Sequence, residues 1–145
     1  MTLDIVLRYR TRRPWAPGPT TLRQWARLAA GGRDGELAIR VVDDRESRAL
    51  NQRWRGRPGP TNVLSFPSDA PRGRLIGDIV VCAPLVAREA RAQGKPLAAH
   101  WAHMIVHGTL HLLGFDHARP ADARRMEGRE RALLAHLGIA DPYGD

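Results

Sequence analysis

Three histidines in the second half of the chain have the spacing of metal ligands. His107 and His111 are one helical turn apart, and His117 follows Gly114. Positions i and i+4 of an α-helix differ by about 40° around the axis, so both imidazoles project from one face. Glycine suits a left-handed helix stop, after which the chain can double back toward the same ion. Three protein ligands leave a fourth position for water, as in catalytic zinc sites. We therefore predict one Zn²⁺ per chain, although imidazole also suits nickel, copper or iron.

The same offsets occur in the metzincin proteases, whose pattern is H-E-x-x-H-x-x-G-x-x-H. Those enzymes need a glutamate after the first histidine as general base, and this chain has Gly108 there. The missing carboxylate argues against peptide hydrolysis. Hydrolysis of another bond stays open, because zinc can bring the pKa of bound water to about 7. Phosphodiester cleavage also gains from a cation that stabilises the developing oxyanion.

Other polar residues near this segment have simpler interpretations. His100 and His103 lie earlier on roughly the same helix face. We expect both to pack or to form hydrogen bonds, because three ligands already define an open site. Asp116 has two equal interpretations: a hydrogen bond to a ligand histidine, or a cap of the turn after Gly114.

An arginine could supply the cation that phosphodiester cleavage favours. Arg55 is a candidate, because it precedes a polar Thr61-Asn62 turn ahead of an expected strand. The alternative is an ordinary solvated helix end, since exposed arginines are common.

The charge of the whole chain is strongly basic. The formal net charge is +8, the sequence pI is about 11.2, and Lys95 is the only lysine among 23 basic residues. Arginine forks match phosphate oxygens and stack on bases, so the charge suits a nucleic-acid partner. A compositional bias of the source would produce the same excess, and charge alone leaves both interpretations open.

The elements that must position these residues fit one domain. The chain has 145 residues and is 43% hydrophobic, which suits a single core. Cys82 is the only cysteine and lies in an apolar run, which predicts a buried free thiol. We recognise neither a secretory leader nor the ~20 apolar residues of a membrane span. We therefore expect a soluble, cytoplasmic protein that does not insert into a membrane.

Hydrophobic periodicity and helix-capping residues predict an alternation of strands and helices. A helix begins after Thr20 or Thr21 and ends at Gly31, and another is capped by Asp43-Asp44. The other expected elements are strands over residues 3–7, 37–42, 61–66 and 75–82, and helices over residues 84–93, 97–113 and 120–137. We predict an α+β fold over residues 1–145, with a small mixed sheet of about four strands covered by about five helices. The metal site falls on the long central helix and the turn after it.

Several further motifs lie between about residue 35 and the tail: Leu50-Asn51, Trp54-Arg55-Gly56, the run Pro-Thr-Asn-Val-Leu-Ser-Phe-Pro over residues 60–67, Gly77-Asp78-Ile79 and Asp141-Pro142-Tyr143. Together with the histidine segment, they resemble the YbeY family of bacterial metal-dependent endoribonucleases. The resemblance implies a single α+β domain with zinc held by His107, His111 and His117. It also implies work in 16S rRNA 3′-end processing and ribosome quality control, with rRNA and the small ribosomal subunit as partners.

The resemblance also implies a role for Arg55, which precedes the Thr61-Asn62 turn. Arg55 stands at the family's functional arginine position and is predicted to be catalytic, in contact with RNA or the transition state. Arg55, Thr61 and Asn62 are the predicted substrate-binding residues.

Three functional hypotheses follow from these observations. The first is a single-strand-specific, metal-dependent endoribonuclease of rRNA maturation. The second is a ribosome-assembly factor in which the metal mainly stabilises the fold. The third, a metalloprotease, is disfavoured by Gly108. The sequence does not indicate an oligomeric state.

Overall fold

Four runs rich in valine, isoleucine and leucine form one sheet in the computed structural model, which describes residues 2–144. The strands are β1 (Leu3–Tyr9), β2 (Asp34–Val42), β3 (Val63–Pro67) and β4 (Arg74–Cys82). They are ordered β1-β2-β4-β3. β1, β2 and β4 run parallel, whereas β3 is antiparallel to β4 at the edge. The predicted small mixed sheet is confirmed.

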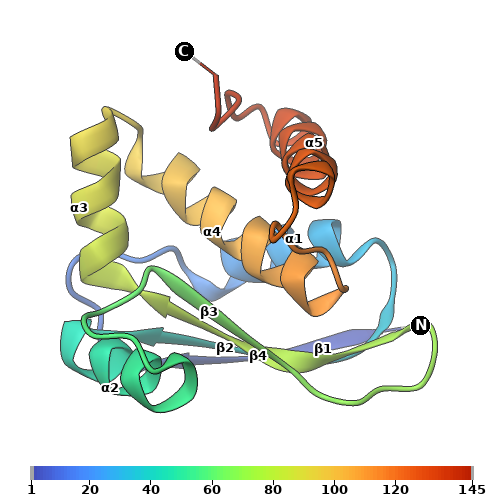
Figure 1. Ribbon diagram of the computed structural model, residues 1–145, viewed down its shortest axis with the longest axis horizontal. Helices are drawn as coiled ribbons and strands as arrows, with labels where there is room; N and C mark the ends of the chain where they lie inside the picture. The colour runs from blue at the N-terminus through green and yellow to red at the C-terminus, as the bar shows by residue number, and fades with distance from the viewer. Residues whose placement is uncertain (1, 145) are drawn as a thin grey trace.

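Within the described residues, five helices complete the single α+β domain: α1 (Pro19–Ala30), α2 (Asp44–Arg55), α3 (Ala83–Gln93), α4 (Leu97–Leu112) and α5 (Pro120–His136). α2 lies on one side of the sheet, and the other four helices lie on the opposite side (Figure 1). α4 is central in that layer, and α5 packs on α4 away from the sheet. The C-terminal segment, residues 137–144, follows α5 and is hydrogen-bonded to the loop before α4 through Lys95 Nζ and Pro142 O. α4 therefore has neighbours on several sides, which makes it a rigid support.

α4 packs closely on the sheet because glycines lie at the points of contact. Gly77 of β4 faces α4, and Gly108 of α4 faces the sheet. A Cβ on Gly77 of β4 would lie 2.8 Å from Leu112 Cδ2 in α4. A Cβ on Gly108 of α4 would lie 3.1 Å from Ile79 Cγ2 and 3.2 Å from Ser65 Oγ. Both positions are too tight for a larger side chain. The absence of a side chain at Gly108 thus has a packing reason as well as a chemical consequence.

Several predicted element boundaries were wrong by two or more residues. β1 continues to Tyr9 instead of ending at residue 7, and β3 begins at Val63 instead of residue 61. Thr20 or Thr21 was expected to cap α1, but α1 begins at Pro19 with Gly18 as N-cap. Proline suits the first helical position because its missing N–H needs no partner there. β2 begins at Asp34 rather than Leu37, since its pairing with β4 starts at Asp34 and Arg74. Cys82 is buried, as predicted. Within residues 2–144, no helix is long and apolar enough to cross a membrane.

Candidate metal centre

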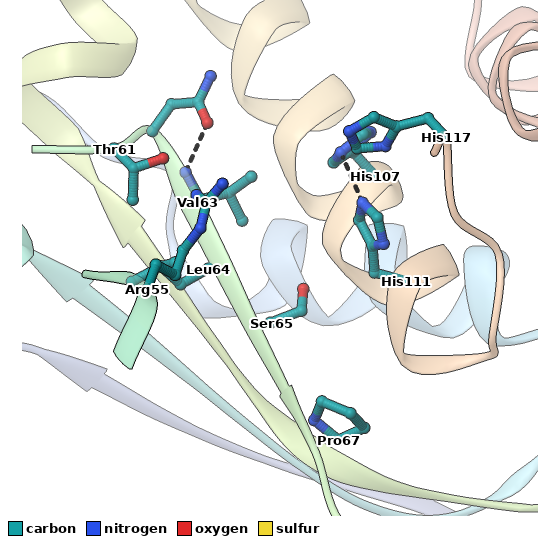
Figure 2. A pocket seen from close by; sticks show the side chains of 10 residues that line it. Arg55, Thr61, Val63, Leu64, Ser65, Pro67, His107, His111 and His117 are labelled. Carbon is teal, nitrogen blue, oxygen red and sulfur yellow. Dashed lines mark hydrogen bonds between the residues drawn. The ribbon is translucent and has the colours of Figure 1, made fainter. Parts of the chain in front are cut away.

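The three predicted ligands converge at the C-terminal end of α4. His107 and His111 project from the same helix face, with their Nε2 atoms 3.1 Å apart. Gly114, at φ 98°, turns the chain after the helix. The His117 ring then lies 5.6 Å from that of His107 and 5.1 Å from that of His111, measured between centroids. Figure 2 shows the three rings grouped beside one another.

The donor set of this cluster fits a divalent cation. One nitrogen from each ring lies within 4.8 Å of the others. Two nitrogens that share a tetrahedral zinc ion at bond lengths of 2.0–2.1 Å are roughly 3.3 Å apart, close to the 3.1 Å between His107 and His111. His117 is exposed, so its ring can adjust to complete the set. Three imidazole nitrogens are a donor set that zinc accepts.

Burial and the neighbouring imidazoles keep His111 uncharged at neutral pH. Burial, and then the nearby imidazoles of His107 and His117, lower the pKa of His111 to about 4. A neutral imidazole has the free lone pair that a metal needs. The site is therefore ready to ligate without losing a proton from His111.

A buried carboxylate lies behind His107. His107 Nδ1 is 3.0 Å from Glu130 Oε2, and His103 Nε2 is 2.8 Å from the same oxygen. Tyr143 donates its hydroxyl to Glu130 Oε1 at 2.7 Å. Burial alone would raise the pKa of Glu130, but the hydrogen bonds from His103, His107 and Tyr143 bring it down to about 2. His103, His107 and Glu130 form a second group whose donor atoms are close enough to hold a metal.

A cavity of about 520 Å³ opens beside the histidines. Its lining combines the three histidines with Arg55, with Thr61 and Asn62 of the loop before β3, and with Ser65 of β3 itself. The volume lies in the range of ligand sites, about 300–1,000 Å³. Figure 2 shows Arg55 on the wall opposite the histidines, across β3. The structure thus brings every predicted site residue to one cavity.

The buried polar face of α2 explains how Arg55 reaches this wall. Asp43 caps α2 by accepting a bond from Glu46 N at 2.9 Å, as predicted. One turn later, Ser47 Oγ donates to Thr61 O at 2.8 Å and accepts from Thr61 N at 3.0 Å. Asn51 Nδ2 donates to Gly59 O at 3.0 Å. These bonds fix the loop from the end of α2 to β3.

Asn62 is held at both ends of its side chain. Its Nδ2 donates to Glu89 at 3.1 Å, and its Oδ1 accepts from Val63 N at 2.7 Å. Glu89 in turn lies 2.9 Å from His100 Nε2. Asn62 therefore faces the cavity in a fixed orientation. Ser65 Oγ donates to Gly108 O at 2.9 Å and joins β3 directly to the helix that carries the metal ligands.

Comparisons with known proteins agree on one family. The model of the family described as "Endoribonuclease YbeY" matches residues 20–138. A relative of that name from Halorhodospira halophila is 57% identical, over 88% of both chains. Another, from Alkalilimnicola ehrlichii, is 55% identical over 97% of this chain and 91% of its own. This chain belongs to the YbeY family. A solution structure of TM1509 from Thermotoga maritima shares the fold, with a TM-score of 0.59 and 22% identity over 99% of this chain.

In this YbeY chain, the structure agrees with an interpretation made from the sequence for each of His100, His103 and Asp116, whereas the residues to which the two histidines bond were not predicted. His100 and His103 make hydrogen bonds, as predicted. Asp116 Oδ1 accepts from Ala118 N at 3.1 Å, which supports the interpretation as a turn cap.

The carboxylate partner of His107 was missed, although the sequence carried a signal. Glu130 occupies the fully buried position between Met126 and Leu134 on α5, at the four-residue spacing of a helix face. A charge on such an apolar face requires a partner. Tyr143 carried a weaker signal, because it lies in a short polar tail.

Proposed function

We propose that this chain is a single-strand-specific, metal-dependent endoribonuclease that acts in 16S rRNA 3′-end maturation and ribosome quality control, and that residues 1–145 form one endoribonuclease domain. The observation that carries the proposal is the cavity in which three histidines face Arg55. Membership of the YbeY family supports it, because the relatives compared above are named as endoribonucleases. The proposed partners are rRNA and the small ribosomal subunit, and the proposed location is the cytoplasm.

The proposed cofactor is one Zn²⁺ per chain, held by His107, His111 and His117. The geometry of the three imidazoles supports zinc, while nickel, copper and iron remain chemically compatible. When bound, such an ion supplies Lewis-acid chemistry at the phosphate and makes water more acidic.

The chain's own residues supply position and charge. Arg55, exposed at the end of α2, is proposed to neutralise the negative charge that develops on the phosphate. Thr61 and Asn62 are proposed to contact the RNA from the same wall, Asn62 in the orientation set by Glu89 and Val63. The net charge of +8 would attract the RNA backbone without selecting a sequence.

The geometry around Gly108 disfavours the protease alternative. A protease of this ligand pattern needs a carboxylate at that position, and the space beside it is filled by Ile79, Ser65 and Val63. In the assembly-factor alternative, the same metal cluster stabilises the fold. An experiment is therefore needed to distinguish this alternative from the nuclease hypothesis.

The test compares wild type with His111→Ala on an rRNA precursor, each incubated with Zn²⁺. His136→Ala is the matched control, because His136 is an exposed histidine in the last turn of α5. We expect the His111 variant to lose cleavage and the His136 variant to keep it. Equal cleavage by all three proteins would refute metal-dependent catalysis.

A second measurement tests the assembly-factor alternative on the same preparations. Thermal unfolding is followed with and without a chelator. If chelation unfolds the wild type and the zinc-loaded protein has no nuclease activity, the metal is structural and the assembly-factor hypothesis holds.

A further inference from the structure

The carboxylate of Glu130 is fully buried where α4, α5 and the C-terminal segment meet. Its exposed fraction is 0%, and no other carboxylate is among the buried residues that the structure describes. Its two oxygens are contacted by three side chains: His103 at 2.8 Å, His107 at 3.0 Å and Tyr143 at 2.7 Å. A buried charge with this many donors is stabilised in its ionised form.

The two nitrogens of His107 face different partners. Nε2 lies 3.1 Å from His111 Nε2, inside the three-histidine cluster. Nδ1 lies 3.0 Å from Glu130 Oε2 on the opposite side of the ring. A carboxylate at that distance favours the tautomer with hydrogen on Nδ1, which leaves the Nε2 lone pair free for a metal.

We propose that Glu130 is the positioning residue of the metal centre and that Tyr143, in the C-terminal segment, fixes Glu130 so that this segment completes the site. Glu130 accepts the Nδ1–H of His107 and so sets both the tautomer and the direction of the ligand ring. This inference rests on the three-histidine metal site proposed above.

The C-terminal segment is held well enough to act in this way. Asp141 Oδ1 accepts from Tyr143 N at 2.8 Å, and Arg131 Nε donates to Asp141 Oδ2 at 2.9 Å. Lys95 Nζ donates to Pro142 O at 3.0 Å, which ties the segment to the loop between α3 and α4. The Arg131 guanidinium also lies 5.3 Å from the centre of the Tyr143 ring. Tyr143 therefore has a defined position over Glu130, although it is 42% exposed.

Glu130 is a hydrogen-bond acceptor in this proposal and not a ligand of a second ion. An ion held by His103, His107 and Glu130 would have to replace the bonds from both imidazoles. His107 would then bridge two ions through both of its nitrogens, and it would have to give up its Nδ1 proton. One ion and one oriented imidazole satisfy the same atoms without that cost.

The experiment measures Zn²⁺ affinity and stoichiometry by competition with a chromophoric chelator. Glu130→Gln removes the charge, and Tyr143→Phe removes only the hydroxyl. The matched control is Glu36→Gln, an exposed glutamate on β2, outside this cluster. Loss of an outer partner of a ligand histidine typically weakens metal binding about 10–100-fold. We expect that range for Glu130→Gln, a smaller loss for Tyr143→Phe and no change for Glu36→Gln.

A readout without metal separates positioning from simple structural support. Long-range ¹H–¹⁵N correlations report which His107 nitrogen carries the proton in the metal-free protein. We expect an unprotonated Nε2 in the wild type and a mixed signal in Glu130→Gln, while the melting temperature of metal-free Tyr143→Phe stays near that of the wild type.

Three results would overturn the proposal. Wild-type zinc affinity in both variants would remove the positioning role. If Glu130→Gln fails to fold, Tyr143→Phe still tests the role of Tyr143, and the His107 tautomer of the wild type still tests the role of Glu130. Two zinc ions per wild-type chain, with one lost in Glu130→Gln, would make Glu130 a ligand. A His107 tautomer protonated at Nε2 would contradict the hydrogen bond itself. Absence of any zinc binding by the wild type would instead refute the proposed metal site.

Discussion

Replacing Gly108 with alanine should destabilise the protein, although alanine is the better helix former. The new Cβ would lie 3.1 Å from Ile79 Cγ2, 3.2 Å from Ser65 Oγ and 3.3 Å from Val63 Cγ2. Two of these neighbours are β-branched residues of the sheet, whose rotamers have little freedom. Overpacking of this kind costs about 1–3 kcal/mol, whereas the gain in helix propensity is about 1 kcal/mol. We expect a net loss of about 1 kcal/mol.

The matched control is Gly128→Ala, at an exposed position of α5, where an added Cβ meets nothing within 4 Å. That change should stabilise the protein by roughly 0.5–1 kcal/mol, because only helix propensity and unfolded-state entropy change. Urea unfolding of metal-free protein measures both free energies of unfolding. If Gly108→Ala stabilises the protein as much as Gly128→Ala does, the close approach of α4 to the sheet is not the reason for glycine at this position.

Three further predictions concern other parts of the molecule. Arg55→Ala should lower the rate of RNA cleavage by about 10²-fold or more while leaving zinc affinity unchanged, as measured by single-turnover kinetics and chelator competition. Burial raises the pKa of the Cys82 thiol to about 11, so iodoacetamide at pH 8 should label the folded protein far more slowly than protein unfolded in guanidinium, where the pKa is about 8.5. The hydrogen bond from Arg88 lowers the pKa of Asp44, so this carboxylate stabilises the fold above its unfolded pKa. The stability difference between wild type and Asp44→Asn should therefore shrink as the pH falls through the folded pKa, as measured by urea unfolding at pH 7 and pH 3.

Each of these predictions has a clear contrary outcome. Equal cleavage by wild type and Arg55→Ala would leave this arginine as a solvated helix end. Fast labelling of Cys82 in folded protein would contradict its burial. A stability difference at Asp44 that does not change with pH would show that its ion pair with Arg88, 2.9 Å long between partly exposed side chains, contributes nothing.

The three-histidine cluster could be predicted because its geometry is local. His107 and His111 share a helix face, and Gly114 supplies the turn that returns His117. The carboxylate behind them could not be placed in the same way. Glu130 reaches His107 only through the packing of α5 on α4, which periodicity does not specify.

The helix and strand boundaries illustrate the same limit. α3 ends at Gln93 before Gly94 as predicted, because glycine in a left-handed conformation stops a helix locally. The start of β2 was misplaced, since its first residues become strand through their parallel neighbours in β1 and β4. The prediction that Arg55, Thr61 and Asn62 belong to the site depended on the resemblance to the YbeY family. The hydrogen bonds that join α2 to the loop before β3 are not visible in the sequence.

One reconstitution measurement tests the central claim most directly. Metal is removed from the wild-type protein, and the initial rate of cleavage of a single-stranded RNA is measured as Zn²⁺ is added back. Three histidines around one position predict a rate that rises with zinc, reaches its plateau at about one equivalent per chain and stays at background when His117 is replaced by alanine. A cleavage rate that does not change with added metal, or that survives in the His117 variant, would contradict a metal-dependent nuclease built on these histidines.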